Sequence, residues 1–107
     1  MIHKYFVYIV SNNKRSVVYT GVTKSLTERI RQHERGERKG FSKKYNCTDL
    51  IYYESFQYIH EAIKRENQIK KYSRKKKDDL IQAFNPRFKT LYPISKSQKL
   101  LLYSHPD

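Results

Sequence analysis

Two tyrosines in strand-like segments are the first residues whose type and spacing could do chemistry. Tyr8 lies in YFVYIV and Tyr19 lies in VVYTGV, with Gly21 closing the second segment. If the turn between them centres on residues 13 and 14, the tyrosines are direct cross-strand partners on one face. A phenol beside a cation can act as a general base, and a second phenol can position water or phosphate. Gly21 would allow close approach of a backbone or substrate. The alternative is two ordinary strand tyrosines and a glycine that ends a strand.

A helix after the second strand carries the next candidates. Ser25 followed by Glu28 is typical of a capping box, and Gly36 is placed to end the helix. Arg29 and His33 are four residues apart, so we expect them on one side of this helix. An arginine can bind and stabilise a phosphate, and a histidine can orient the nucleophile or leaving group. The alternative is a solvated charged face.

Glu66 interrupts an apolar helical stripe. Apolar residues recur with the period of a helix before and after Glu66. Those before it are Ile59, Ala62 and Ile63, and the one after it is Ile69. A carboxylate in such a stripe must be paired, bound to a metal or at the wet edge of the stripe. It could therefore form a structural ion pair with a nearby lysine or arginine. It could equally be a single carboxylate ligand of Mg²⁺, which keeps several waters.

The elements that must position these residues form a small α+β domain. Apolar periodicity and turn residues predict a ββαβαα order, with a three-stranded sheet that is antiparallel or mixed. We expect residues 1–92 to form the domain and residues 93–107 to be a loosely attached tail. The predicted strands are 4–11, 16–22 and 50–56, and the predicted helices are 25–36, 59–72 and 73–85, the last ended by Pro86.

Composition narrows the function classes. The chain of 107 residues has 23 lysines and arginines against 10 acidic residues, a formal charge of +13. Such an excess favours a polyanion, with nucleic acid first and an anionic membrane surface second. A single cysteine, Cys47, excludes an intramolecular disulfide and a cysteine-rich zinc site, and we expect it to be a small buried residue. The chain opens directly into a strand pattern and has no long apolar run. We therefore expect no signal peptide, no membrane span and a cytoplasmic location.

Taken together, these segments resemble the GIY-YIG nuclease domain in its short, stand-alone bacterial form of the UPF0213 type. The two signature tripeptides correspond to Phe6-Val7-Tyr8 and Tyr19-Thr20-Gly21. The resemblance continues through YTGVTKSLTERIRQHERG, then LIYYESF and EAIKRENQIKKY, to the Asn85-Pro86 pair, and covers roughly residues 4–92. The first tripeptide has Phe6 in place of its glycine, and the second has Thr20 in place of isoleucine.

The resemblance implies a three-stranded antiparallel sheet flanked by helices and a divalent-metal-dependent endonuclease that hydrolyses DNA phosphodiester bonds. The cation would be Mg²⁺ or Mn²⁺, and the setting would be DNA repair or recombination. The implied roles are metal binding by Glu66, general-base catalysis by Tyr8 with help from Tyr19, stabilisation of the pentavalent phosphate by Arg29 with His33 beside it, and substrate or fold support by Asn85.

We expect no second domain that would read DNA sequence. Binding would fall to the basic loop 34–46, including Lys43 and Lys44, to the run 74–77 and to the tail. Phosphate contacts position a duplex but do not read its sequence, so we expect weak, non-specific or structure-directed binding. A protein partner could then supply the specificity. Two alternatives stay open: a nucleic-acid-binding module of this fold with little or no turnover alone, and a basic structural protein of a ribonucleoprotein, in which the partner is RNA.

Overall fold

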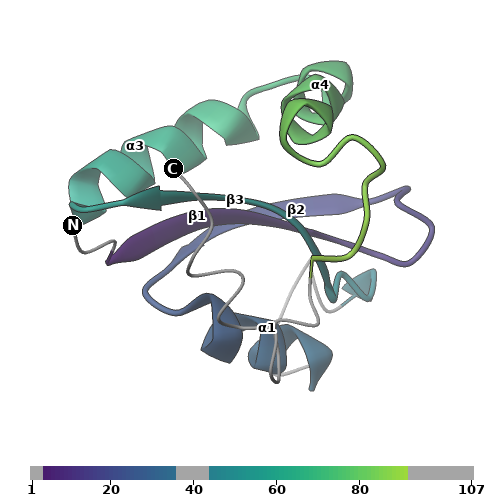
Figure 1. Ribbon diagram of the computed structural model, residues 1–107, viewed down its shortest axis with the longest axis horizontal. Coiled ribbons are helices and arrows are strands. Elements are labelled where there is room, and N and C mark those ends of the chain that lie inside the picture. The colour runs from purple at the N-terminus through teal and green to yellow at the C-terminus, as the bar shows by residue number, and fades with distance from the viewer. Residues whose placement is uncertain (1–3, 36–43, 92–107) are drawn as a thin grey trace.

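The chain has the predicted α+β architecture with the element order ββαβαα (Figure 1). The structure is a computed structural model that describes residues 4–35 and 44–91. The tail 93–107 and the division expected at residue 92 lie outside these ranges. The strands are β1 (Tyr5–Ser11), β2 (Val18–Thr23) and β3 (Asp49–Phe56), and the helices are α1 (Leu26–Glu34), α3 (Ile59–Lys70) and α4 (Arg74–Phe84).

The three strands form one antiparallel sheet in the order β2-β1-β3. Because β1 is central, it pairs on both sides, and its residues from Phe6 to Ser11 are all buried. This explains why the strand is apolar at nearly every position. Side chains alternate between the two faces of a strand. Tyr8 accordingly belongs to one apolar cluster, whereas Val7 and Ile9 belong to the other.

Helices cover both faces of the sheet. Helix α1 packs Leu26 and Ile30 on the face that carries Tyr8, and α3 and α4 pack on the opposite face through Ala62, Ile69 and Ile81 (Figure 1). The sheet therefore separates two apolar cores. In the described ranges, no helix is long and apolar enough to cross a membrane.

Hydroxyl caps fix where two helices begin. The Ser25 hydroxyl accepts a hydrogen bond from the backbone N–H of Glu28 at 3.2 Å, which confirms the predicted start of α1. Ser73 caps α4 in the same way. Helix α4 ends one residue before Asn85-Pro86, as the proline predicts. Gly36, the predicted end of α1, lies outside the described residues.

The pairing predicted for Tyr8 and Tyr19 is wrong. Tyr8 lies opposite Gly21, and Tyr19 lies opposite Val10. The register has slid by two residues relative to the prediction. Since side chains alternate with a period of two, such a slide leaves both tyrosines on the same face. The consequence is that a glycine, not a second tyrosine, faces Tyr8 across the strands.

The turn between β1 and β2 explains this register. The strands close at Ser11 and Val18, so the turn centres one residue later than predicted. The side-chain oxygen of Asn12 accepts a hydrogen bond from the N–H of Val17 at 3.0 Å. Arg15 adopts a left-handed backbone with φ of 60°. The polar turn therefore holds six residues between the strand ends.

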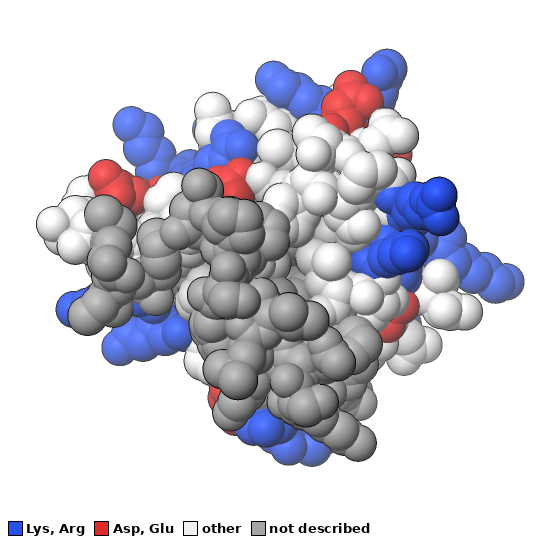
Figure 2. All heavy atoms as spheres, in the orientation of Figure 1, with Lys and Arg blue, Asp and Glu red and all other residues white. Residues whose placement is uncertain are grey.

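Basic side chains occur at several points around the rim of the face drawn in Figure 2, and acidic side chains lie beside some of them. Part of the charge in the run 74–77 is already partnered. Arg74 pairs with Asp78 at 2.9 Å, and Lys75 pairs with Asp79 at 3.2 Å. The Arg74 guanidinium also donates to two backbone carbonyls of the β1–β2 turn. Arg74 thus joins α4 to the hairpin.

Cys47 is buried, with 1% of its surface exposed, which confirms the prediction of a small buried residue. Its thiol lies against the Val17 carbonyl at 4.0 Å. Burial raises the pKa of the Cys47 thiol, although a backbone hydrogen bond from Asn12 opposes this shift. The residue therefore packs as a neutral thiol.

Candidate active site

Tyr8 joins two residues of α1 through its hydroxyl group. The Tyr8 hydroxyl lies 3.2 Å from Nε2 of His33, and Nη1 of Arg29 donates to the same hydroxyl at 3.5 Å. Tyr8 is fully buried and His33 is 4% exposed, whereas Arg29 is partly exposed. The phenol is thus held between an imidazole and a guanidinium that also reaches the surface.

Local sequence explains this convergence. Arg29 and His33 are one helical turn apart, so both project from the same side of α1. The adjacent residues Leu26 and Ile30 anchor α1 on the sheet face that carries Tyr8. The side of the helix next to this apolar seam therefore reaches the Tyr8 hydroxyl. The predicted common side of Arg29 and His33 and the observed contacts agree.

Gly21 makes room for the Tyr8 phenol. A Cβ atom at position 21 would lie 2.4 Å from the Tyr8 hydroxyl oxygen and 2.6 Å from Cζ. Carbon atoms cannot approach so closely, so a side chain at this position would displace the ring. The sequence predicts that Gly21 permits a close approach. In the structure, the approaching group is the tyrosine of the neighbouring strand.

Tyr19 completes the aromatic cluster from β2. Its ring centroid lies 5.9 Å from that of His33, at an interplanar angle of 61°. The ring of Tyr8 contacts His33 in a similar edge-to-face arrangement at 5.7 Å. Tyr19 is only partly buried, whereas Tyr8 has no exposed surface. Of the two tyrosines, Tyr19 is therefore the one with exposed surface.

Glu66 lies on α3, in the layer on the other side of the sheet (Figure 1). Its carboxylate pairs with Lys70 at 3.1 Å, and its side chain is 17% exposed. Ala62 and Ile69 on the same helix are buried. The predicted apolar stripe is wrong at Ile59 and Ile63, which are 41% and 44% exposed. Helix α3 packs through Ala62 and Ile69, so Glu66 lies at the edge of the apolar stripe, where water reaches it.

A small hollow connects the α1 and α3 layers at the end of β2. It has a volume of about 280 Å³, and its lining includes Arg29 from α1 and Ile59 from α3. Val22 and Thr23 form its wall from the edge strand. Glu66 follows Ile59 by seven residues, which is two helical turns and about 10 Å along the same side of α3. Arg29 and Glu66 therefore both belong to the sides of their helices that lie toward β2.

If the protein binds a divalent cation near Arg29, Glu66 is the carboxylate that would hold it. Among residues 4–35 and 44–91, no group of three or more histidine, cysteine, aspartate or glutamate side chains could enclose a metal ion. Mg²⁺ does not require such a group, because it commonly binds one or two carboxylates and retains water. A partly exposed carboxylate with a single lysine partner fits that mode of binding. Glu66 is therefore chemically suited to hold the ion together with water and substrate oxygens.

Asn85 supports the fold in this structure. Its side-chain nitrogen donates to the carbonyls of Ile51 at 3.0 Å and Lys89 at 2.7 Å, and its oxygen accepts from the N–H of Lys89 at 3.1 Å. The buried amide thus ties the segment after α4 to β3. Lys44 is exposed, with its Nζ 5.5 Å from the ring centroid of Tyr45. Lys43 lies outside the described residues.

Sequence reasoning missed a polar network on the α3 face. The Tyr52 hydroxyl donates to the Glu54 carboxylate, and Arg65 pairs with that carboxylate at 2.9 Å. Arg65 also donates to Gln68 at 2.6 Å and to the Tyr72 hydroxyl at 3.3 Å. The sequence does contain one indication of this network. Side chains alternate along β3, so residues 52 and 54 lie on the same face of the sheet. Their partner on α3 could not be read from local spacing.

Comparisons with known proteins agree with the sequence-based expectation of family. The family model described as the GIY-YIG catalytic domain matches residues 4–79. A UPF0213 protein of Staphylococcus epidermidis is 39% identical over 79 residues, which cover 74% of this chain and 95% of that protein. A UPF0213 protein of Staphylococcus aureus is 40% identical over 78 residues, covering 73% and 94%. The solution NMR structure of a UPF0213 protein from Bacillus halodurans is 28% identical, covers 90% of this chain and 95% of that one, and has a TM-score of 0.48.

Proposed function

The chain belongs to the GIY-YIG family, and we propose that it is a divalent-metal-dependent endonuclease that hydrolyses DNA phosphodiester bonds in the cytoplasm. The observation that carries this proposal is the contact of the Tyr8 hydroxyl with both His33 and Arg29. Tyrosine, imidazole and guanidinium groups can supply general-base catalysis and charge stabilisation in a metal-assisted phosphodiester cleavage, beside a carboxylate that holds the metal. A protein that only binds nucleic acid gains nothing from a carboxylate such as Glu66 near the DNA phosphates, because the carboxylate repels them.

Arg29 would stabilise the negative charge that develops on the phosphate during attack. Its guanidinium is partly exposed, lines the hollow at the end of β2 and has one donor on Tyr8. A guanidinium presents several fixed donors, so the remaining donors can bind phosphate oxygens. The contact with Tyr8 would orient the guanidinium before the substrate arrives. His33, which is buried, would hold Tyr8 and the ring of Tyr19 in position.

We propose different roles for the two tyrosines in general-base catalysis. Tyr8 remains the residue that the family resemblance assigns to this role. Its complete burial, however, favours Tyr19 as the phenol that meets the attacking water. We propose that Tyr19 accepts or orients the proton of water and that Tyr8 acts through His33 and Arg29. A proton acceptor must reach the water within hydrogen-bond distance, which is why accessibility decides between them.

Glu66 would hold the cation, which we propose to be Mg²⁺ or Mn²⁺. When bound, such an ion polarises a phosphate oxygen and favours ionisation of a bound water. The carboxylate would keep Lys70 as a neighbour, and this lysine could bind a non-bridging phosphate oxygen once the ion is present. The sides of α3 and α1 that lie toward β2 would then enclose the scissile phosphate from two layers.

DNA binding would come from lysines and arginines spread over the surface, which contact phosphates. It would not come from a helix or strand that reads the base sequence. Lys44 is exposed, whereas residues 36–43 of the basic loop and residues 93–107 of the tail lie outside the described residues. We therefore propose binding that is weak and directed by DNA shape, with a protein partner supplying further selectivity. RNA stays an alternative substrate. Asn85 would contribute by support, because its amide is occupied by backbone groups.

The test is a cleavage assay on a panel of labelled DNAs: duplex, nicked, flap, junction and single strand. Each is incubated with the protein and Mg²⁺, Mn²⁺ or a chelator. We expect cleavage in Mg²⁺ or Mn²⁺, loss of cleavage in Glu66→Gln, and near-normal cleavage in the matched variant Glu61→Gln on the same helix. Binding should survive in both variants. Binding without cleavage under every condition would instead favour the binding-module alternative.

A pair of conservative variants separates the tyrosines. Tyr19→Phe should remove cleavage while leaving stability close to that of the parent, because its ring stays in place. Tyr8→Phe should lower both cleavage and stability, because it leaves buried His33 without a hydrogen bond that the structure gives it. If Tyr8→Phe alone abolishes cleavage and Tyr19→Phe cuts normally, Tyr8 is the base.

A further inference from the structure

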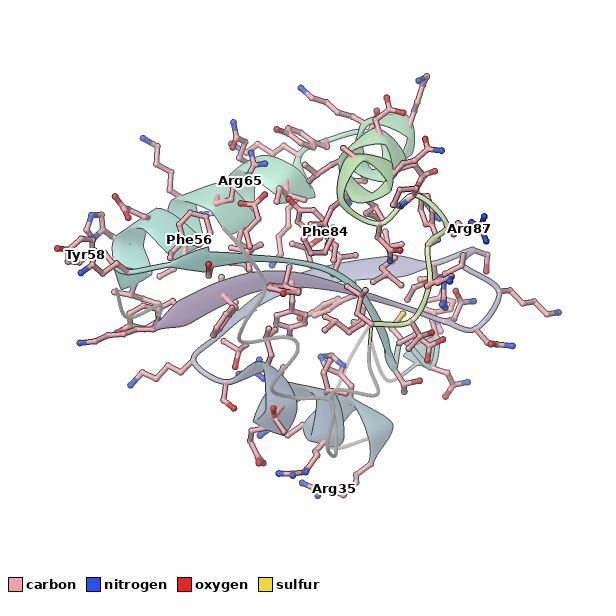
Figure 3. All side chains as sticks on the ribbon, viewed as in Figure 1. Arg35, Phe56, Tyr58, Arg65, Phe84 and Arg87 are labelled. Carbon is pink, nitrogen blue, oxygen red and sulfur yellow. The ribbon has the colours of Figure 1, made fainter. Side chains whose placement is uncertain are left out.

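A second hollow lies on the α3 face, on the side of the sheet opposite Tyr8. It has a volume of about 790 Å³. One wall is Phe56 at the end of β3, and the other is the side of α3 that carries Lys64 and Gln68, with Lys71 and Tyr72 just beyond the helix. Figure 3 shows Phe56 and Arg65 on this side of the sheet. The proposed cleavage site uses none of these residues.

Three residues that line this hollow, Arg65, Gln68 and Tyr72, belong to one polar network. Arg65 donates through Nε and Nη2 to the Glu54 carboxylate at 2.9–3.1 Å, and the Tyr52 hydroxyl donates to the same carboxylate. The remaining donor group of Arg65 contacts Gln68 and the Tyr72 hydroxyl. Its charge is therefore neutralised by Glu54. Arg65 acts as a positioning residue, because it holds the Tyr72 side chain against the hollow.

The rim of the hollow is basic, and two of the residues that line it, Phe56 and Tyr72, are aromatic. Lys64 and Lys71 are exposed at the rim. Lys76 lies beside it, with its Nζ 4.2 Å from the centroid of the Tyr72 ring. Against these three cations, the described residues that line the hollow include one acidic residue, Glu61. Aromatic rings combined with lysines match a ligand that carries both planar bases and phosphates.

We infer that this hollow binds an unpaired stretch of nucleic acid, with a base against Phe56 and Tyr72 and the flanking phosphates at Lys64 and Lys71. A duplex keeps its bases stacked inside, so only a single-stranded segment can offer a base to such a hollow. The inference builds on the proposed nuclease function and names its substrate class. DNA with a single-stranded arm would be preferred over blunt duplex.

Binding of a fluorescein-labelled oligothymidylate of about 15 nucleotides, followed by fluorescence anisotropy over a range of salt concentrations, tests this inference. The variant Lys64→Ala/Lys71→Ala should weaken binding and make the log–log salt slope shallower by about 1.4, because each phosphate contact on a single strand contributes about 0.7. The control Lys14→Ala/Arg87→Ala removes two exposed charges that do not line the hollow, and Figure 3 shows Arg87 at the other end of the molecule from Phe56, so the slope should change much less.

Tyr72→Leu tests the aromatic part. It should lower affinity for the oligothymidylate by about 5- to 150-fold, the range for loss of one stacked base, with the salt slope unchanged. Circular dichroism of each variant checks that it is folded. Equal losses in the hollow and control variants, or an unchanged affinity in Tyr72→Leu, would overturn the inference.

These binding results are independent of the catalytic proposal. Hollow variants should cut a blunt duplex at the parental rate and lose only their preference for a flap substrate. If the protein cuts no DNA, the anisotropy comparison still decides whether the hollow binds single strands. If it cuts but the hollow variants keep the same flap preference as the parent, the hollow inference alone fails.

Discussion

Replacing Gly21 with alanine is a sharp structural test of the candidate site. The added Cβ would lie 2.4 Å from the Tyr8 hydroxyl oxygen, 2.6 Å from Cζ and 2.9 Å from Cε2, where ordinary contacts are 3.4–4 Å. The phenol must therefore move by about 1 Å. Tyr8 is fully buried and contacts His33, so its ring cannot move without repacking the core beneath α1.

The size of the effect follows from these contacts. Overpacking of a buried site costs about 1–3 kcal/mol. Loss of the hydrogen bond between Tyr8 and His33 adds about 0.5–1.5 kcal/mol. We therefore expect Gly21→Ala to lower the free energy of unfolding by roughly 2–4 kcal/mol, which corresponds to roughly 10–25 °C in Tm for a domain of this size. Any folded fraction should cut DNA roughly 10²-fold more slowly, the scale for a 1 Å displacement of a catalytic group.

Urea unfolding followed by circular dichroism measures the cost in two backgrounds. Tyr8→Leu removes all three atoms that the new Cβ would meet. We expect Gly21→Ala to cost roughly 2–4 kcal/mol in the parent and under about 1 kcal/mol in Tyr8→Leu, so the two changes should couple strongly. An equal cost in both backgrounds would refute the argument that Gly21 exists to admit the Tyr8 phenol.

Three further predictions concern residues around the sheet. Thr20→Val should raise the urea midpoint by the equivalent of about 1 kcal/mol, because the buried Thr20 hydroxyl has no hydrogen-bond partner among the described residues; a lower midpoint would contradict this. Burial, followed by the hydrogen bond to Glu54, raises the pKa of Tyr52 above the ordinary tyrosine value of 10.0. The stability that this residue contributes is therefore complete below pH 10 and should fall above it by about 1.4 kcal/mol per pH unit, a decline that unfolding titrations of Tyr52→Phe should lack. Asn85→Ala should cost roughly 3 kcal/mol in thermal or urea unfolding, because it leaves buried backbone groups unpaired; loss of cleavage at unchanged stability would show a direct role in substrate binding instead.

The elements were predictable because their signals are local. An apolar run predicts the central strand β1, and serine hydroxyl caps predict the starts of α1 and α4. The register of the hairpin was not predictable to the residue. It depends on how Asn12 closes the turn and on the left-handed backbone of Arg15, which are properties of a six-residue turn as a whole.

Long-range polar contacts escaped prediction for a different reason. Arg15 binds Asp49 at 2.7 Å and also donates to the Phe88 carbonyl and the Thr90 hydroxyl. These partners are 34 to 75 residues away in the chain, so no periodicity connects them to Arg15. The basic composition suggested partners outside the protein. Several arginines instead hold the fold together.

The candidate site was only partly readable from spacing. The four-residue separation of Arg29 and His33 predicts their common side of α1, and the structure places both at the Tyr8 hydroxyl. Glu66 was found as an anomaly in a helical stripe, but the stripe itself is half exposed. Local patterns do not state which layer a helix joins. That Glu66 and Arg29 share one site is therefore a proposal from the fold, in which Arg29 lines the hollow beside β2 and Glu66 lies two helical turns beyond Ile59.

The central claim is that residues from opposite layers of the sheet act on one phosphate. Single-turnover nicking of supercoiled plasmid DNA by Arg29→Ala, Glu66→Ala and the double variant tests it most directly. Groups that act as a unit are strongly non-additive, so we predict that the double variant cuts no more than a few-fold slower than the slower single variant. Losses that multiply in the double variant, or a Glu66→Ala protein that cuts at the parental rate, would contradict a shared site.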